Sequence, residues 1–400
     1  MREDPNVTRL VTPASTVASG PHQGAVPSLV RPPPVDQCSR RATAIVYCEG
    51  NFGAVDGKTA NGLVRHSERY EILSVIDSEK AGRDAGEVLG DPANGIPVLA
   101  SLDEAIADGG HAPAFLIFGM APASGMLSPV ERRLMLDAMG RGISIVNGLH
   151  EFLNDDPEFA AAAEAHQVSI LDVRRPRAKK NLRMFTGRIS TVTCPRIAVL
   201  GTDGAIGKRT TATILTAALN AAGIKAVLIG TGQTGLIQGA RYGVALDAIP
   251  CQFCSGELES TVVEAFEREH PDVIIIEGQG ALSHPAYLTS TFIMRGAQPN
   301  AVILQHAPAR RFLCDFPNIA MPTAASEINL IQTFAETKVI GLTLNHEHMT
   351  DAAVTEAIAK YERGLGLPVT DALTRPASRL VDMVLGGFPQ LARRPILGAA

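Results

Sequence analysis

The stretch "IAVLGTDGAIGKRTTATILTAALNAAG", residues 197–223, places a buried strand, a glycine-rich turn and a helix in immediate succession. Gly201, Gly204 and Gly207 relieve the steric limits of a tight turn, and the helix that follows ends at Gly223. The backbone N–H groups of such a turn and the positive end of the helix dipole both favour an anion. The stretch therefore predicts a phosphate-binding loop within an α/β domain.

This turn departs from the usual phosphate loop, G-x-x-x-x-G-K-[ST]. Thr202 stands at the position of the first glycine, and Arg209 occupies the Ser/Thr position that would help to hold Mg²⁺. Lys208 is retained, and Thr210 matches a position that commonly touches an α-phosphate. The pattern favours binding of a pyrophosphate over hydrolysis of Mg-ATP. The predicted cofactor-binding residues are Gly201, Thr202, Asp203, Gly204, Ala205, Ile206, Gly207, Lys208, Arg209, Thr210 and Thr211.

Short apolar runs alternate with segments of helical length along the rest of the chain, as a parallel sheet covered by helices requires. Four runs precede the phosphate loop, "TAIVYC", "EILSVID", "AFLIFG" and "ISIVNG"; a second series comprises "RIAVLG", "KAVLIG", "DVIIIEG", "AVILQH" and "KVIGLTLNH". We therefore predict an α/β protein with two domains. The expected parts are a mostly disordered Pro-rich tail at 1–41, a Rossmann-like domain at 42–190 and a P-loop NTPase-like domain at 191–400.

Length and charge narrow the class of protein. A chain of 400 residues is too long for one ordinary core, and a net charge of −5 provides no overall basic field for nucleic acid. No apolar run approaches the roughly 20 residues needed to cross a bilayer, and the N-terminus does not read as a secretory signal. Six scattered cysteines suit a reducing compartment. We expect a cytoplasmic protein without a nucleic-acid or membrane partner.

The segment that joins the two series, "DVRRPRAKKNLRMFTGR", is strongly basic. Seven basic residues accompany a single acidic one: Arg174, Arg175, Arg177, Lys179, Lys180, Arg183 and Arg188. One interpretation is a solvated linker; the other is a positive rim that attracts a polyanionic ligand.

Two candidate catalytic residues lie at the end of the strand "DVIIIEG" and in the loop that follows it. Glu277 ends the strand, where open α/β sheets place their ligands, and it is either a general base or a cap on the next turn. His284 follows in a loop rich in Gly, Ser and Pro, as a candidate base for an amine or as an ordinary surface histidine.

Other polar residues are predicted at the ends of neighbouring strands. The glycine-rich segment after "KAVLIG" offers substrate contacts through Gln233, Thr234 and Arg241. Arg310 and Arg311 follow the strand "AVILQH" and suit recognition of carboxylates. Asn345 follows "KVIGLTL" at a position where P-loop proteins often read an adenine edge.

No metal site is predicted. The trio His346, Glu347 and His348 lacks further ligands at metal-binding spacing, and "CQFC" has no second Cys pair to complete a zinc ribbon. In the stretch "SGELES", Ser255 is expected to cap a helix, with Glu257 or Glu259 in its first turn.

The loop "GTDGAIGK" resembles that of the dethiobiotin synthetase-like P-loop proteins. Taken with "EGQGALSHPAY", it is also similar to a two-domain family, long of unknown function, that includes D-glutamate N-acetyltransferases. That resemblance covers about residues 42–390. It implies transfer of an acetyl group from acetyl-CoA to the amino group of an acidic amino acid, D-glutamate above all, by a homo-oligomer. The loop would then hold the CoA pyrophosphate, Glu277 or His284 would be the base, and Arg241, Arg310 or Arg311 would hold the substrate carboxylates.

Two alternatives remain open. The first is a ligase or kinase that uses ATP with Mg²⁺ to activate a small carboxylate, with Asp203 or Glu277 supplying the lost metal ligand. The second is a nucleotide-binding regulator without catalytic activity. Arg209 directly after Lys208 disfavours the ATP-dependent alternative.

Overall fold

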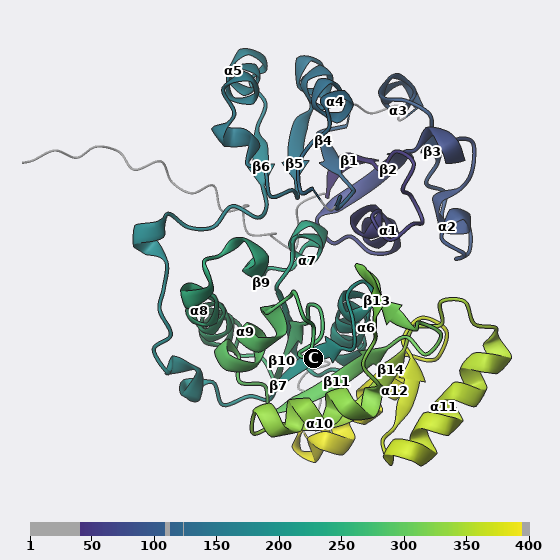
Figure 1. Ribbon diagram of the computed structural model, residues 1–400. Helices are drawn as coiled ribbons and strands as arrows, with labels where there is room; N and C mark the ends of the chain where they lie inside the picture. The colour runs from purple at the N-terminus through teal and green to yellow at the C-terminus, as the bar shows by residue number, and fades with distance from the viewer. Residues whose placement is uncertain (1–40, 109–112, 123, 394–400) are drawn as a thin grey trace, which may run out of the picture.

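The computed structural model describes residues 41–108, 113–122 and 124–393. The predicted tail over 1–41 therefore lies outside the described residues apart from Arg41. Figure 1 shows two α/β units, with the N-terminal unit above and the C-terminal unit below. Each is built around its own parallel sheet, which confirms the predicted fold class.

The N-terminal sheet has six strands in the order β3-β2-β1-β4-β5-β6, all of them parallel. Its strands are β1 (Ala42–Tyr47), β2 (Tyr70–Ile76), β3 (Val98–Leu99), β4 (Phe115–Phe118), β5 (Ser144–Asn147) and β6 (Ile170–Asp172). The four predicted runs are β1, β2, β4 and β5. Strands β3 and β6 were not predicted, because both are too short to show a periodic pattern.

Five α-helices accompany this sheet within residues 41–108, 113–122 and 124–172. They are α1 (Lys58–Arg65), α2 (Ala85–Val88), α3 (Leu102–Asp108), α4 (Pro129–Gly140) and α5 (Pro157–His166). Local chemistry fixes where two of them begin. Ser128 and Glu131 form a capping box around Pro129 at the start of α4, and Asp156 caps α5 in front of Pro157.

The C-terminal sheet has seven parallel strands in the order β15-β14-β11-β7-β10-β8-β9. They are β7 (Arg196–Gly201), β8 (Ala226–Gly230), β9 (Tyr242–Gly243), β10 (Val273–Glu277), β11 (Ala301–His306), β14 (Lys338–Leu344) and β15 (Val369–Asp371). The five predicted runs are β7, β8, β10, β11 and β14. The strand that leads to the phosphate loop, β7, lies in the middle of this sheet.

Helices cover both faces of this second sheet, as predicted. They are α6 (Lys208–Ala221), α7 (Gln233–Gln238), α8 (Cys251–Glu269), α9 (Thr289–Gly296), α10 (Ala324–Phe334), α11 (Asp351–Leu365) and α12 (Ser378–Gly387). Strand β7 shows the division. Ile197 and Val199 join the core formed with α6 and α12, while Ala198 and Leu200 join the core formed with α8 to α11.

The basic segment between the two sheets is neutralised by acidic side chains. Arg174 pairs with Asp247, Arg177 with Glu257 and Arg188 with Glu267. Arg175 pairs with Asp155 and Asp172. The positive rim that was one interpretation of this segment is therefore not what these four arginines form.

Buried carboxylates of α8 hold the backbone of the same segment. Glu257 accepts from the N–H of Arg183, and Glu259 accepts from the N–H groups of Thr186 and Ile189. Helix α8 begins at Cys251, so the predicted cap at Ser255 is wrong. The "SGELES" stretch lies inside the helix, where its two glutamates attach the linker.

Helix α7 belongs to the C-terminal part of the sequence but packs on the N-terminal domain. Its Ile237 is buried in the N-terminal core, and the Thr234 hydroxyl lies 2.8 Å from the Thr59 hydroxyl of α1. The predicted domain boundary between residues 190 and 191 falls in the connection from β6 to β7, so α7 makes its contact from the far side of that boundary.

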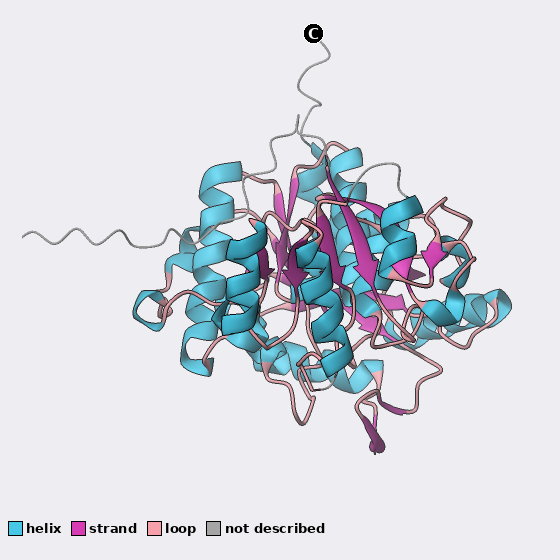
Figure 2. Ribbon diagram, turned by 90° about the horizontal axis from the view of Figure 1, so that it is seen from above, coloured by secondary structure: helices cyan, strands magenta, loops and turns pink. Residues whose placement is uncertain are grey.

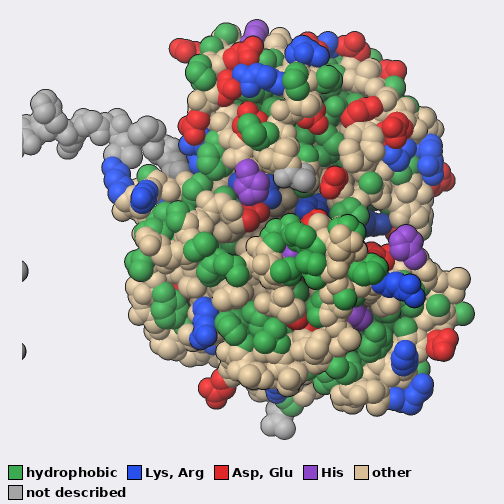
Figure 3. Space-filling model, in the orientation of Figure 1, with side chains coloured by type: hydrophobic (Ala, Val, Ile, Leu, Met, Phe, Trp, Pro, Cys, Tyr) green, Lys and Arg blue, Asp and Glu red, His purple; other side chains and the backbone are tan. Residues whose placement is uncertain are grey.

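A two-stranded antiparallel hairpin, β12 (Phe312–Leu313) and β13 (Phe316–Ala320), projects from the body of the C-terminal domain (Figure 2). In the space-filling view, basic and acidic side chains are interspersed over the N-terminal domain, and green hydrophobic side chains gather on the C-terminal domain (Figure 3). None of the helices in the described part of the chain has the length and apolar character that crossing a membrane requires.

Candidate functional site: a phosphate loop and its surroundings

The predicted phosphate loop is a tight turn between β7, which ends at Gly201, and α6, which begins at Lys208. Two of its residues adopt left-handed backbone conformations, Ala205 at a φ of 48° and Gly207 at a φ of 99°. Gly207 is the N-cap of α6, so no side chain accepts from the first-turn N–H groups at that position. These N–H groups and the helix dipole form an anion-binding geometry.

Lys208 places a buried positive charge within this turn. Its side chain is only 5% exposed, and its Nζ donates to the backbone carbonyl of Asp203. Burial lowers the pKa of Lys208 to about 8, an effect that nearby Asp203 partly opposes. An anion in the turn would compensate this charge.

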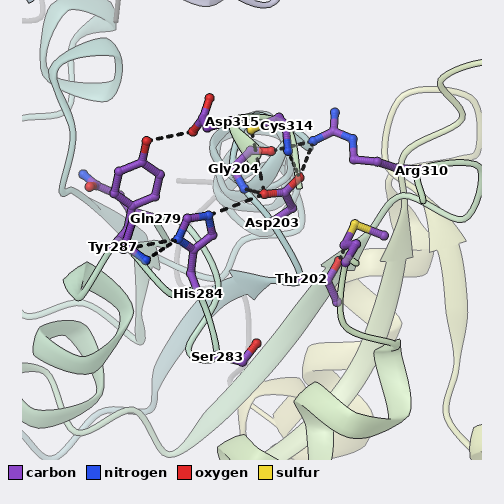
Figure 4. A network of polar contacts seen from close by, with 12 residues as sticks. Thr202, Asp203, Gly204, Gln279, Ser283, His284, Tyr287, Arg310, Cys314 and Asp315 are labelled. Carbon is purple, nitrogen blue, oxygen red and sulfur yellow. Dashed lines mark hydrogen bonds and ion pairs between the residues drawn. The ribbon is translucent and has the colours of Figure 1, made fainter. Parts of the chain in front are cut away.

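Asp203 is a loop residue whose carboxylate connects the loop to the segment of the β12–β13 hairpin. One carboxylate oxygen accepts from the N–H of Gly204 at 2.6 Å. The other accepts from Arg310 Nη1 at 2.8 Å and from the N–H of Cys314 at 2.9 Å (Figure 4). Arg310 also makes a two-pronged contact with Glu347. Arg310, predicted to bind a substrate carboxylate, is thus already engaged with two protein carboxylates.

Arg209 connects the loop to the N-terminal domain. Its Nη1 donates to Gln238 Oε1 of α7, and Gln238 Nε2 donates to the carbonyls of Gly62 and His66 at 2.6 and 2.8 Å. The guanidinium also lies against Gly62, where an added Cβ would be 2.5 Å from Arg209 Nη2. The residue at the usual metal-hydroxyl position therefore serves as a link between domains, a role that requires the length of an arginine.

Three other predicted cofactor-binding residues use their side chains within the protein. Thr211 donates to Gln305 Oε1 at 2.7 Å, and the Thr202 hydroxyl lies 3.0 Å from His306 Nδ1. Asn345 lies beside the loop and donates to the Ile206 carbonyl at 3.1 Å. Ala205 is exposed, and Gly204 and Thr210 are partly exposed, so these positions are open to a ligand.

Glu277 lies buried at the carboxyl end of β10. Its Oε2 accepts from the N–H groups of Thr231 and Gly232, at 2.9 and 3.3 Å, so it caps the turn that leads into α7. Burial raises its pKa, and the charge of Arg209 opposes that rise more than any other group. The structure thus shows the capping interpretation. It also shows a raised pKa, which suits a general base.

His284 lies in the loop after β10, only 5% exposed and stacked on the ring of Tyr287, with centroids 4.4 Å apart. Its Nδ1 accepts from the N–H groups of Ala286 and Tyr287, both at 3.2 Å. Its Nε2 lies 4.0 Å from Asp203 Oδ1 (Figure 4). Burial lowers the pKa of this imidazole. The loop thus brings the predicted His284 to the phosphate loop.

The predicted substrate residues do not form one group. Gln233 and Thr234 are buried at the start of α7, with Gln233 against Gly148 of the N-terminal domain. Arg241 was expected at the carboxyl end of a strand, but the structure places it elsewhere. It precedes the edge strand β9, pairs with Glu269 at 2.7 Å and lines a cleft of about 360 Å³ that none of residues 201–211 lines. Arg311 is exposed beside the hairpin.

Several residues of this region were missed from the sequence. Gln305 receives hydrogen bonds from Thr211 and Thr343, and Gln279 donates to the Thr231 carbonyl. Tyr287 donates to Asp315 at 2.8 Å. A polar residue that interrupts an apolar run at its carboxyl end, as Gln305 does in "AVILQH", is a usable signal. The Tyr287–Asp315 contact joins residues 28 positions apart, so no local sequence signal indicates it.

The residues considered for metal or redox chemistry do not form a common site among the described residues. His346 contacts Asp371 and Glu347 contacts Arg310, so two members of the H-E-H trio have different partners. Over the described ranges, no group of three or more His, Cys, Asp or Glu side chains is arranged to hold a metal ion. Cys251 and Cys254 are free thiols in the first turn of α8.

Known proteins resemble the chain in both domains. Residues 183–381 match the P-loop domain, and residues 78–176 the Rossmann-like domain, of the domain-of-unknown-function family DUF1611. A D-glutamate N-acetyltransferase of Tritonibacter scottomollicae is 32% identical over 289 residues, which is 70% of this chain and 83% of that protein. One of a Pseudoalteromonas species is 31% identical over 264 residues, or 64% of this chain and 77% of that protein.

A solved structure gives the same result. The crystal structure of a DUF1611 family protein from Anabaena variabilis superposes with a TM-score of 0.80 at 32% sequence identity. The match covers 86% of this chain and all of that one. The two domains, their order along the chain and the phosphate loop between β7 and α6 therefore identify this chain as a member of the DUF1611 family.

Proposed function

We propose that this protein is an N-acyltransferase that moves an acetyl group from acetyl-CoA to the amino group of an acidic amino acid, D-glutamate first among them. The observation that carries the proposal is the phosphate loop. It has a buried lysine and free first-turn N–H groups for a pyrophosphate, but an arginine tied to Gln238 at the metal-hydroxyl position. The names of the two acetyltransferase relatives support the choice of reaction.

The loop residues suit the pyrophosphate of CoA. The backbone N–H groups from Ala205 to Lys208 and the Lys208 ammonium would hold its oxygens, as at other helix N-termini. Asp203 does not oppose this binding, because its carboxylate already accepts from Gly204, Arg310 and Cys314. No metal is needed to bind a pyrophosphate that is not cleaved.

Glu277 is the base in this proposal. It takes a proton from the substrate ammonium, and the freed amine attacks the thioester carbonyl carbon; the amide bond forms, the C–S bond breaks, and the second proton of the nitrogen passes to the departing thiolate to give the CoA thiol. A carboxylate with a raised pKa holds that proton better than an exposed one. Arg311 is the predicted arginine that ion pairs within the described residues leave available for a substrate carboxylate.

The test is a binding titration with acetyl-CoA and with Mg-ATP, followed by turnover with D-glutamate. Lys208→Ala should weaken acetyl-CoA binding by about tenfold to a hundredfold, the value of a charge-assisted hydrogen bond in a buried site. Lys180→Ala, which removes an exposed lysine of the linker, is the matched control and should bind as the wild type does.

Two outcomes would reject the proposal. Binding of Mg-ATP without binding of acetyl-CoA would favour a ligase or kinase. This is the first alternative because the loop resembles that of dethiobiotin synthetase-like P-loop proteins. Tight binding of either ligand without turnover on any amino acid would favour a nucleotide-binding regulator.

A further inference from the structure

His284 occupies a site whose hydrogen bonds fix the state of its ring. The loop from Gly278 turns back at Gly280, which has a φ of 57°, and brings the imidazole to the phosphate loop. The side chain is fully buried and stacks on Tyr287, with the two ring planes 13° apart. Tyr287 is in turn fixed by its hydrogen bond to Asp315 (Figure 4). The ring has little freedom to rotate.

The two backbone contacts decide which nitrogen carries the proton. Backbone N–H groups only donate, so Nδ1 must accept from both Ala286 and Tyr287 through its lone pair. In a neutral imidazole the proton then resides on Nε2. Proton uptake at Nδ1 would set its new N–H against two other N–H groups. His284 is therefore built to donate from Nε2 and is poorly built to accept a proton.

The donor itself has no partner. Nε2 is buried and, among the described residues, makes no hydrogen bond. The nearest carboxylate oxygen, Asp203 Oδ1, is 4.0 Å away, beyond hydrogen-bond distance, and already accepts from the N–H of Gly204. A buried donor left unsatisfied destabilises the site that holds it. The site is thus arranged for an acceptor atom from outside the protein, beside the phosphate loop.

We infer that His284 is a catalytic hydrogen-bond donor rather than a base, and that its acceptor is the carbonyl oxygen of the thioester. The choice of acceptor rests on the proposed function. When the amine nitrogen attacks the carbonyl carbon, the electron pair of the C=O bond moves to oxygen, and Nε2–H stabilises the oxyanion. Collapse restores the C=O bond and expels the CoA thiolate. One ammonium proton goes to Glu277 before the attack, the second proton of the attacking nitrogen passes to the departing thiolate to give the CoA thiol, and the His284 proton stays on Nε2.

This assignment separates the two candidates that the sequence left as alternatives. Glu277, whose pKa is raised, receives the proton; His284, whose Nδ1 is occupied, supplies the hydrogen bond. A preformed donor in a water-excluded site contributes most to the transition state, because it needs no reorganisation as charge develops.

The first experiment reads the ring directly in the intact wild-type chain. Two-bond ¹H–¹⁵N correlation spectra of protein labelled at histidine nitrogen, assigned with His284→Gln, should show a protonated Nε2 and an unprotonated Nδ1. Addition of acetyl-CoA should shift the Nε2–H resonance, whereas CoA should not. CoA is the matched probe because it offers the same pyrophosphate and pantetheine arm without the thioester carbonyl.

The second experiment compares two variants. His284→Gln keeps an N–H donor and should retain kcat within about tenfold, whereas His284→Ala should lose about 10²–10³-fold in kcat with little change in KM. The acidic limb of the pH–rate profile should persist in His284→Gln, because it belongs to another group.

Three results would overturn the inference: an Nδ1–H tautomer, equal loss of activity in both variants, or an Nε2–H resonance that CoA shifts as much as acetyl-CoA does. Failure of the wild type to bind acetyl-CoA is a different result. It would reject the proposed function and with it the thioester as acceptor, while the tautomer would still decide whether His284 is a donor.

Discussion

At the scale of single residues, the phosphate loop is defined by charges that are buried before any ligand arrives. Lys208 lies in the turn, where its Nζ donates to the backbone carbonyl of Asp203, and burial lowers its pKa to about 8. Near neutral pH the ammonium is charged at a cost that a bound anion would offset. Ligand binding and protonation of Lys208 are therefore coupled.

This coupling predicts a pH dependence of acetyl-CoA binding. Above pH 8, Lys208 of the free protein is mostly neutral, so binding must be accompanied by uptake of a proton. The affinity should fall by up to about tenfold per pH unit above that value, one proton being linked to binding. Calorimetric titrations between about pH 7 and pH 9.5 measure it. Lys208→Ala should show a flat profile, and an equally flat profile in the wild type would contradict the prediction.

The sequence identified most of these residues but not their partners. Glycine spacing and an adjacent strand and helix are local signals, so the loop and Lys208 could be located. The partner of Arg209 is Gln238, 29 positions away, and Arg310 reaches Asp203 across 107 positions. Such pairs are set by how elements pack, and one sequence carries no trace of them. The misplacement of Arg241 has the same origin.

At the scale of elements, helix α8 attaches the interdomain linker. Glu259 is 2% exposed and accepts from the N–H groups of Thr186 and Ile189 and from the Thr186 hydroxyl. Glu257, two residues earlier on the helix, accepts from the N–H of Arg183. The helix predicted to be capped at Ser255 begins earlier, at Cys251 directly after Pro250, so that Glu257 and Glu259 lie within it.

Glu259→Ala should destabilise the protein by about 2–4 kcal/mol, since it leaves buried linker donors without an acceptor. Urea unfolding followed by circular dichroism measures the change. Glu267→Ala is the matched control on the same helix, because its ion pair with Arg188 is solvent-exposed and should contribute almost nothing. Similar losses from both variants would mean that the linker contacts are not responsible.

At the scale of the whole molecule, the fold follows from the sequence more closely than the domain interface does. Long β-branched runs separated by helical segments are sufficient to predict two parallel sheets, and nine such runs are strands. Short edge strands such as β3 and β9 carry too few residues for a pattern. The packing of α7 on the N-terminal core, through Ile237, depends on tertiary contacts alone.

Gly62 of α1 allows the two domains to approach. A Cβ there would lie 2.5 and 2.7 Å from the Arg209 guanidinium nitrogens, while α1 itself would gain about 0.5–1 kcal/mol from alanine. Gly62→Ala should therefore keep the N-terminal domain folded but loosen the interface and lower kcat/KM by about tenfold.

Hydrogen exchange supplies the direct measurement for this variant. The Glu68 N–H, which donates to the Gln238 carbonyl across the interface at 2.8 Å, should exchange faster in Gly62→Ala. Gly140→Ala, at the end of α4 where the nearest atom to a new Cβ is 4.0 Å away, is the control. Unchanged protection of Glu68 would show that Arg209 adapts without opening the interface.

Arg209 also bears on how such a chain evolves. Exchange of this residue for threonine would bring the loop closer to G-x-x-x-x-G-K-[ST] in one step, yet it would remove the contact with Gln238 and the positive charge that opposes the raised pKa of Glu277. The protein with threonine at position 209 would have a weaker domain interface and would gain no benefit from a metal ion. The domain interface thus disfavours divergence toward a metal-dependent nucleotide loop, and we expect descendants of this chain to vary residues around the loop while the arginine stays.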